Sequence, residues 1–110
     1  MANKYFRKHL IPAPAAETDM YIVPDANTSI LSSLRVTNPN PGPASITVSV
    51  YPTGGGSEYY LLKGYSLPAN GTMDVFSGVS VILEATDELT IEASIAPVHF
   101  YLSYLEMDRN

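Results

Sequence analysis

Apolar and polar residues alternate with a period of two along both halves of the stretch from Ser29 to Pro52. In the first half, Ile30, Leu34 and Val36 share one face, and in the second half every second residue of SITVSV is isoleucine or valine. The run PNPGP separates the halves. A period of two is typical of a strand with one buried face, and prolines, asparagines and a glycine are typical turn residues. The pattern predicts a long β-hairpin with one buried face and one solvent-exposed face.

The same alternation predicts strands along the rest of the chain. We expect them at about residues 19–23, 58–63, 72–76, 79–83, 89–95 and 98–105. In the last of these, Val98, Phe100, Leu102 and Tyr104 fall on one face, and no segment has helical periodicity. About eight short strands separated by turn sequences predict an all-β protein, an antiparallel β-sandwich with Greek-key or jelly-roll-like connections.

The N-terminal residues differ from the rest of the chain. Pro12 and Pro14 exclude a regular helix and favour an extended path. Three of the six basic residues, Lys4, Arg7 and Lys8, lie in the same stretch. We therefore divide the 110 residues into an extended N-terminal arm (1–17), a β-sandwich domain (18–106) and a C-terminal tail (107–110).

Composition and charge exclude several classes of protein. There is no cysteine, which excludes disulfides and thiolate chemistry, and no apolar run is long enough to span a membrane. The proline-broken sequence after Leu10 does not make a secretory signal, so we expect folding in a cytoplasm. A net charge of -5 argues against nucleic-acid binding. Charged residues make up only 15%, which fits either a surface covered by other subunits or a β surface rich in serine and threonine.

No arrangement of residues predicts catalysis. His9 lies in the expected arm, and His99 alternates with apolar residues and should point outward. No serine lies in a nucleophile-elbow sequence. Carboxylates gather at Glu84, Asp87, Glu88 and Glu92, where a solvated face, a calcium site and paired catalytic carboxylates are the alternatives. We expect the solvated face, and therefore no enzyme, no cofactor and no metal.

Several large apolar residues are predicted on faces that should be polar, which favours a protein–protein interface. Ordinary packing at sheet edges is one alternative. A sugar-binding platform built from Tyr59, Tyr60, Tyr65 or Tyr101 is another. The interface candidates, together with residues of the arm, are Tyr5, Phe6, Arg7, Leu10, Ile11, Leu31, Tyr51, Phe76, Ile82, Tyr101 and Leu105.

Short motifs spread over residues 18–106 resemble a known family. They are MYIVP at 20–24, ANTSI at 26–30, SLRVTN at 33–38, YLL at 60–62, LPA at 67–69, LEA at 83–85, Asp87, AS at 93–94 and SYLE at 103–106. The sequence resembles small β-sandwich virion proteins of tailed bacteriophages. It departs from their pattern at Asp25, Asn70, Thr86 and the proline-rich 39–43 loop, which affects loop shape more than the strand plan.

The resemblance implies a non-enzymatic structural protein of a phage particle, present in many symmetric copies. We expect a capsid decoration or cement subunit that stabilises neighbouring shell subunits through its arm and outer strands. A carbohydrate-binding, fibre or baseplate accessory module of the tail is the alternative. The expected partners are major capsid or tail subunits and further copies of the chain, with a trimer favoured, and neither nucleic acid nor a membrane. The expected location is the virion, assembled in the host cytoplasm.

Overall fold

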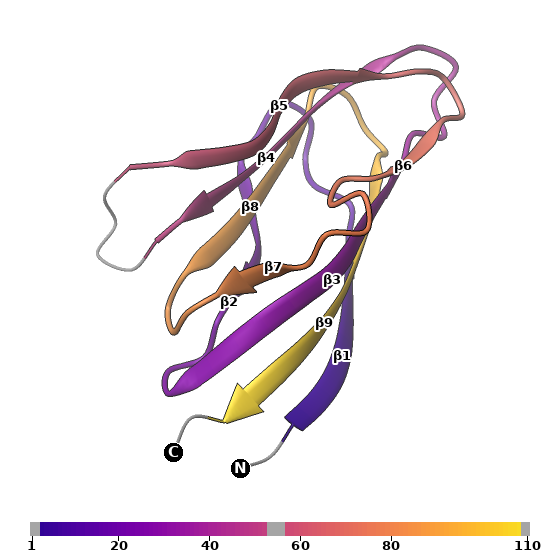
Figure 1. Cartoon of the computed structure of the whole chain (residues 1–110). Coiled ribbons are helices and arrows are strands. Elements are labelled where there is room, and N and C mark those ends of the chain that lie inside the picture. Colours follow the sequence, from indigo (N-terminus) through magenta and orange to yellow (C-terminus); the bar gives the residue numbers. More distant parts are fainter. Residues whose placement is uncertain (1–2, 53–56, 109–110) are drawn as a thin grey trace.

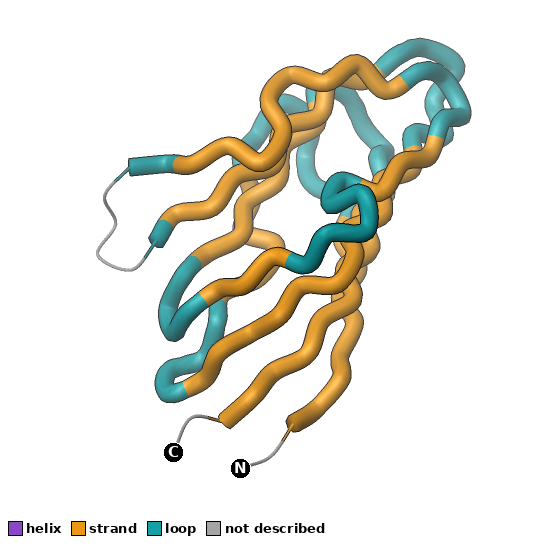
Figure 2. Tube along the Cα trace, in the orientation of Figure 1, coloured by secondary structure: helices purple, strands orange, loops and turns teal. Residues whose placement is uncertain are grey.

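The computed structural model describes residues 3–52 and 57–108, which form strands joined by turns and loops, without a helix among them (Figures 1 and 2). The strands are β1 (Asn3–Leu10), β2 (Thr18–Ile22), β3 (Asn27–Thr37), β4 (Ala44–Tyr51), β5 (Tyr59–Leu67), β6 (Thr72–Asp74), β7 (Val81–Leu83), β8 (Glu88–Ala93) and β9 (His99–Asp108).

The strands form two antiparallel sheets with nested pairing. Sheet A has the order β1-β9-β3, and both β6 and β7 pair with the free side of β3. Sheet B has the order β2-β8-β4-β5. The first strand thus pairs with the last, the second with the second to last, and so on inward to β4 and β5. This is the connectivity of a jelly-roll sandwich, which confirms the predicted fold class.

The predicted hairpin between Ser29 and Pro52 is wrong, because its two halves lie in different sheets. β3 pairs with β9 in sheet A, whereas β4 pairs with β5 and β8 in sheet B. The two apolar faces bury each other across the sandwich and do not lie side by side on one sheet. Both arrangements give the same alternation, so the pattern alone does not distinguish them. Residues 38–43 form an arch from one sheet to the other (Figure 1).

Asn38 holds this arch together. Its side chain is fully buried, and its Nδ2 donates to the carbonyl oxygens of Gly42 at 2.9 Å and Leu67 at 3.1 Å, with that of Pro68 at 3.2 Å. Its Oδ1 accepts from the backbone N–H of Asn40 at 3.1 Å. One amide therefore bonds carbonyl groups from two segments of the chain, of which the contact with Leu67 is buried, as burial of polar groups requires.

A β-bulge in β3 reverses the predicted direction of two side chains. The register of β3 against β9 shifts between Leu31 and Ser33. An extra residue changes which side of the strand faces the core. Leu31, predicted to face outward as an interface residue, is fully buried together with Leu34 and Val36. Ile30, predicted to face inward, lies on the outer face.

Phe76 is also buried, at 6% exposure, and not outward as predicted. The predicted 72–76 strand ends at Asp74, whose Oδ1 accepts from the backbone N–H groups of Leu34 and Phe76. The chain then turns through Ser77, which has a positive φ of 52°, and Phe76 folds under this turn. Val79, predicted to face inward, is 68% exposed in the following loop.

Part of the segment expected to be an arm is a strand of sheet A. β1 pairs with β9 over its whole length, from Asn3 opposite Met107 to Leu10 opposite Phe100. Polar and apolar residues alternate imperfectly here because β1 lies at the sheet edge, where both faces meet solvent. Pro12 follows the strand and is buried.

The inward face predicted for the last strand is confirmed. Val98, Phe100, Leu102 and Tyr104 are all buried in the core between the sheets. The core also receives apolar residues from β2, β3, β4, β7 and β8. It closes the sandwich, so it leaves the two outer faces as the surfaces available for function.

We expect Leu31→Ala to destabilise the fold by about 2–5 kcal/mol, because it removes buried methyl groups and leaves a cavity. The matched control is Leu61→Ala at an edge strand, where the side chain is 39% exposed and the cost should stay below about 1 kcal/mol. Urea unfolding followed by circular dichroism measures both. Equal costs would contradict the burial of Leu31.

We expect Asn38→Ala to cost about 1–3 kcal/mol, because it removes the side-chain donor of the buried bond to Leu67 and of the partly buried bond to Gly42. Asn40→Ala is the control, since Asn40 lies nearer the surface and water can replace its contacts. The same urea titration measures the free energy of unfolding. A variant as stable as the wild type would show that the arch does not depend on this amide.

Candidate interaction surfaces

An apolar row crosses the outer face of sheet A at one end. Tyr5 lies opposite Leu105, Leu105 opposite Ile30, and Ile30 opposite Ile82. Residues paired across strands share a face, so these four side chains from β1, β9, β3 and β7 form one continuous row. Tyr5 is 84% exposed and Ile82 65%, while the two central side chains are half-buried.

Beyond the apolar row, the outer face of sheet A carries cationic and aromatic side chains. His9 lies opposite Tyr101, and Tyr101 lies opposite Arg35. The rings of His9 and Tyr101 stack with centroids 6.3 Å apart. Arg7 and His99 lie on the same face, each two residues along its strand from this row. Strand pairing thus gathers residues from positions 7, 35 and 101 of the sequence on one surface.

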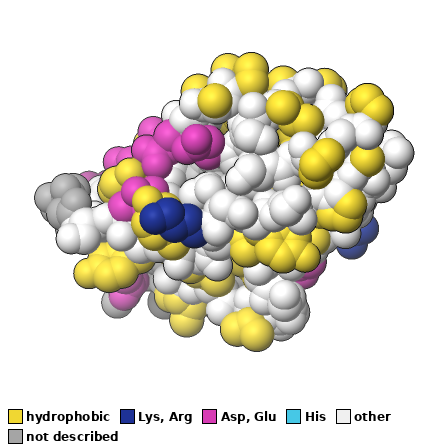
Figure 3. All heavy atoms as spheres, turned by 90° about the horizontal axis from the view of Figure 1, so that it is seen from above, with side chains coloured by type: hydrophobic (Ala, Val, Ile, Leu, Met, Phe, Trp, Pro, Cys, Tyr) yellow, Lys and Arg dark blue, Asp and Glu magenta, His cyan; other side chains and the backbone are white. Residues whose placement is uncertain are grey.

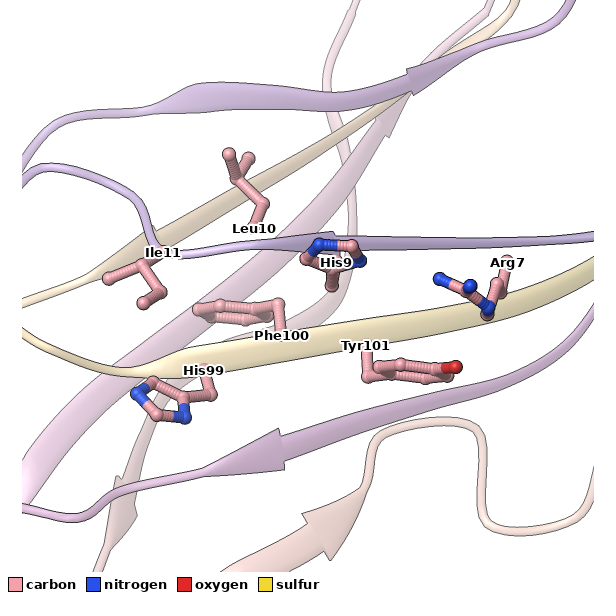
Figure 4. A pocket seen from close by; sticks show the side chains of 7 residues that line it. All are labelled: Arg7, His9, Leu10, Ile11, His99, Phe100 and Tyr101. Carbon is pink, nitrogen blue, oxygen red and sulfur yellow. The ribbon is translucent and has the colours of Figure 1, made fainter.

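A groove of about 630 Å³ runs along β1 and β9 beside this row. Figure 4 shows its polar side chains on the two neighbouring strands, with apolar residues at the end toward Ile11. Such a volume is typical of small ligand sites, but the groove is open and shallow. Its lining residues are Arg7, His9, Leu10, Ile11, His99, Phe100 and Tyr101.

The outer face of sheet B has the opposite character. Figure 3 views the molecule from the side of β5 and shows acidic side chains gathered beside a basic one. Tyr51 donates from its hydroxyl to both carboxylate oxygens of Glu17 at 3.1 Å. Ser49 donates to Glu58 at 2.5 Å, and Glu92 is close enough to repel Glu17.

The crowding of carboxylates changes their ionisation. Desolvation by its neighbours raises the pKa of the exposed Glu17, and the hydrogen bond to Glu58 and the charges of Glu58 and Glu92 raise it further, against the hydrogen bond from Tyr51, which lowers it. The hydrogen bond from Ser49 lowers the pKa of Glu58, so the pKa values of Glu17 and Glu58 shift in opposite directions. The pKa of Tyr51 is raised by desolvation and by its bond to Glu17.

A separate polar contact joins the sheets. The hydroxyl of Tyr21 in sheet B lies 2.5 Å from Ser29 Oγ and donates to Glu106 Oε2 at 2.5 Å, both in sheet A. Burial and the carboxylate of Glu106 raise the pKa of Tyr21. This contact gives the carboxylate of Glu106 a hydrogen-bond donor at the edge of the core, so we assign it a structural role.

The structure places the predicted interface residues in three groups. Tyr5, Phe6, Arg7, Ile11, Ile82 and Tyr101 are exposed, and Leu10, Tyr51 and Leu105 are half-buried. Leu31 and Phe76 are buried and cannot contact a partner from a surface. Sequence reasoning missed Ile30 and Arg35 as neighbours of this surface. Only the bulge and the strand register bring them there.

The tyrosines proposed as a sugar platform do not share one surface. On β5, Tyr60 pairs with the outward Ser49, whereas Tyr59 and Tyr65 pair with the inward Val50 and Ile46. Tyr101 lies on the other sheet.

The predicted carboxylate cluster is also divided. Asp87 accepts from the backbone N–H of Glu84 in a turn, while Glu88 and Glu92 lie on β8. Within residues 3–52 and 57–108, no group of three or more histidine, aspartate or glutamate side chains is placed to hold a metal ion. That same part of the chain contains no helix of the length and apolar character needed to cross a membrane.

Comparisons with known proteins support the fold. No protein-family model and no curated protein matches the chain. Among solved structures, a chain of the Bacillus endospore appendages, which form disulfide-linked pili, has a TM-score of 0.60 and 12% identity over 99% of this chain and 88% of that one. A chain of infectious bursal disease virus (Gx strain) has a TM-score of 0.57 and 12% identity over 94% of this chain and 32% of that one.

A pentameric capsid protein from metagenomic phage sequences covers 93% of this chain and 60% of its own, with 18% identity and a TM-score of 0.42. The first two similarities show that the chain shares its sandwich fold with those proteins. The class defined here is therefore a single jelly-roll sandwich with an apolar and cationic outer face on one sheet and an acidic outer face on the other.

We expect Glu17→Gln to stabilise the protein at neutral pH. A carboxyl group with a raised pKa in the folded state contributes stability below its unfolded value of 4.5, which is lost as pH rises through the folded value. Because glutamine does not ionise, Glu17→Gln should avoid that loss of stability. It should have a higher melting temperature than the wild type at about pH 7, with little difference near pH 4. Thermal unfolding at both pH values measures this. Asp25→Asn, at an exposed turn, is the control, and an equal gain from it would contradict the local cause.

Proposed function

We propose that the chain is a non-enzymatic structural subunit of a virus-like particle, and specifically a decoration or cement subunit of a bacteriophage capsid. In this role the jelly roll is a rigid scaffold, and its outer faces join neighbouring subunits. The partners are shell subunits and further copies of the chain. The location is the assembled particle.

The apolar row of Tyr5, Leu105, Ile30 and Ile82 is the observation that carries this proposal. A contiguous row of large apolar side chains on an exposed sheet face is costly in water and is typical of a surface that binds another protein. The row is built from four strands of a rigid sheet, so it is already shaped for binding. Burying Tyr5 and Ile82 against a partner would contribute roughly 1.5–3 kcal/mol each.

The edge strand β1 supports the same role. Its free side pairs with no strand among the described residues, and it carries Tyr5, Phe6 and Arg7. Such an edge offers backbone N–H and C=O groups to a neighbour. The arm expected from the sequence would bind a neighbour by ordering on contact. Here β1 is already ordered on β9 and would bind through its exposed side.

The solved structures with the same fold support an assembling protein, because one belongs to a pilus and one to a virus. The disulfide links of that pilus do not carry over, since this chain has no cysteine. An assembly of this chain would therefore depend on non-covalent surfaces. The resemblance to phage virion proteins favours a particle over a pilus.

The proposal is tested by mass spectrometry of particles purified by density gradient from a culture that carries this gene. We expect peptides of the chain in the particle band at a constant ratio to the major shell protein. Their absence from the band, with the soluble chain present in the lysate, would overturn the proposal.

The apolar row is tested in the same experiment with Ile82→Ser, which should lower incorporation about tenfold or more, because a buried contact becomes polar. Val79→Ser is the matched control, since Val79 is equally exposed (68% against 65%) but lies in the loop outside the row. If both variants lowered incorporation equally, the apolar row would not be the surface that binds the particle.

A further inference from the structure

The two outer faces of the sandwich differ in charge. The outer face of sheet A carries Arg7 and Arg35 with His9, His99 and one carboxylate, that of Asp74 opposite Arg35. On the side of sheet B lie Glu88 and Glu92 of β8, Glu17 and Glu58 just before β2 and β5, and one cation, Lys63. The faces point in opposite directions because the sheets pack through their inner sides (Figure 1). A net charge of -5 is thus spread unevenly over a small domain.

We propose that the outer face of sheet A of one copy binds the outer face of sheet B of a second copy, with Arg7 and Arg35 of the first against the Glu17 and Glu58 cluster of the second. The proposal deepens the proposed function, because it names the chain itself as the partner of these surfaces.

Charge complementarity selects this pairing over the other two. Two copies joined through their sheet A faces would bring the arginines together, and two joined through their sheet B faces would bring the carboxylates together. Like charges placed opposite one another in a contact with little water oppose binding. Only the contact between unlike faces pairs opposite charges.

The carboxylates on the sheet B side lie close enough together to bind a cation. The charges of Glu58 and Glu92 repel that of Glu17, and the nearby Lys63 lies over the ring of Tyr60, with its Nζ 4.6 Å from the ring centroid. An arginine from a neighbour would relieve the repulsion, because its planar guanidinium can bond a carboxylate with two N–H groups at once.

The cations of sheet A are free to bind. Neither Arg7 nor Arg35 forms an ion pair within the part of the chain that the structure describes. Asp74 lies opposite Arg35, and its Oδ1 accepts from the backbone N–H groups of Leu34 and Phe76, so its charge offsets part of the positive charge of this face without an ion pair to Arg35. The apolar row next to these arginines adds burial to the charge pairing, which supplies affinity that screened charges alone do not.

The contact is heterologous, because it uses a different surface on each copy. Repetition of a heterologous contact gives a closed ring when the rotation closes and a filament when it does not. Each copy in the interior of such an assembly has both charged faces covered, which fits the low share of charged residues, 15%, in the whole chain.

The test uses the full chain in analytical ultracentrifugation at low and high salt. We expect wild-type chain to form assemblies larger than a dimer at low salt and to dissociate as salt screens the faces. Arg7→Gln/Arg35→Gln removes one face and Glu17→Gln/Glu58→Gln removes the other. Each variant alone should associate at least about tenfold more weakly than wild type.

Mixing the two variants gives the decisive result. Each retains the face that the other lacks, so an equimolar mixture should form one-to-one dimers that grow no further. Lys4→Gln/Asp25→Asn neutralises one charge of each sign away from both outer faces and should assemble as wild type does. Circular dichroism confirms that all variants are folded.

A wild-type chain that stays monomeric at high concentration and low salt would overturn the inference, as would variants that both assemble normally or a mixture that forms no dimer. Binding of duplex DNA that only Arg7→Gln/Arg35→Gln abolishes would assign the sheet A face to nucleic acid instead. The chain could still be found in purified particles in each of these cases, so the proposed function is tested separately.

Discussion

The burial of two apolar sheet faces against each other is the interaction on which the rest of this structure depends. Each strand has one side committed to that contact, whether the next strand crosses to the other sheet, as β4 does after β3, or stays in the same sheet, as β5 does after β4. The pairing of β3 with β9 and of β4 with β8 places β3 and β4 on opposite sides of the core, so residues 38–43 form an arch. The buried amide of Asn38 bonds the carbonyl oxygen of Gly42 in the arch and that of Leu67 at the end of β5. Together with the contact of Tyr21 with Ser29, it supplies polar bonds within a mainly apolar core.

The same contact decides which surfaces remain for function. Apolar side chains from both sheets form the core, and the outer faces collect the residues that the core does not take. On sheet A these are an apolar row beside arginines and histidines, and on sheet B they are crowded carboxylates with tyrosines. Because the sheets are rigid, each set is held in a fixed pattern. A fixed pattern of this kind is the basis of the binding role proposed for these faces.

A jelly roll by itself says little about function, since the fold occurs in proteins of different roles. The solved structures that share it here come from a pilus and a virus at 12% identity, which is too low to transfer more than the fold. The functional argument therefore depends on the side chains of the outer faces. The unlike charges of these two faces are the basis of the contact proposed between copies of the chain.

The sequence by itself determined the fold class, most strand positions and the inward face of the last strand, because a period of two records which side of a strand is buried. It could not determine which strands pair, since β3 and β4 show the same alternation in a hairpin as in facing sheets. It also misplaced Ile30 and Leu31, because a β-bulge leaves no mark in composition yet changes every side chain beyond it. The row from Tyr5 to Ile82 was decided only by the tertiary structure, since its residues come from four strands and meet through a register that long-range packing sets.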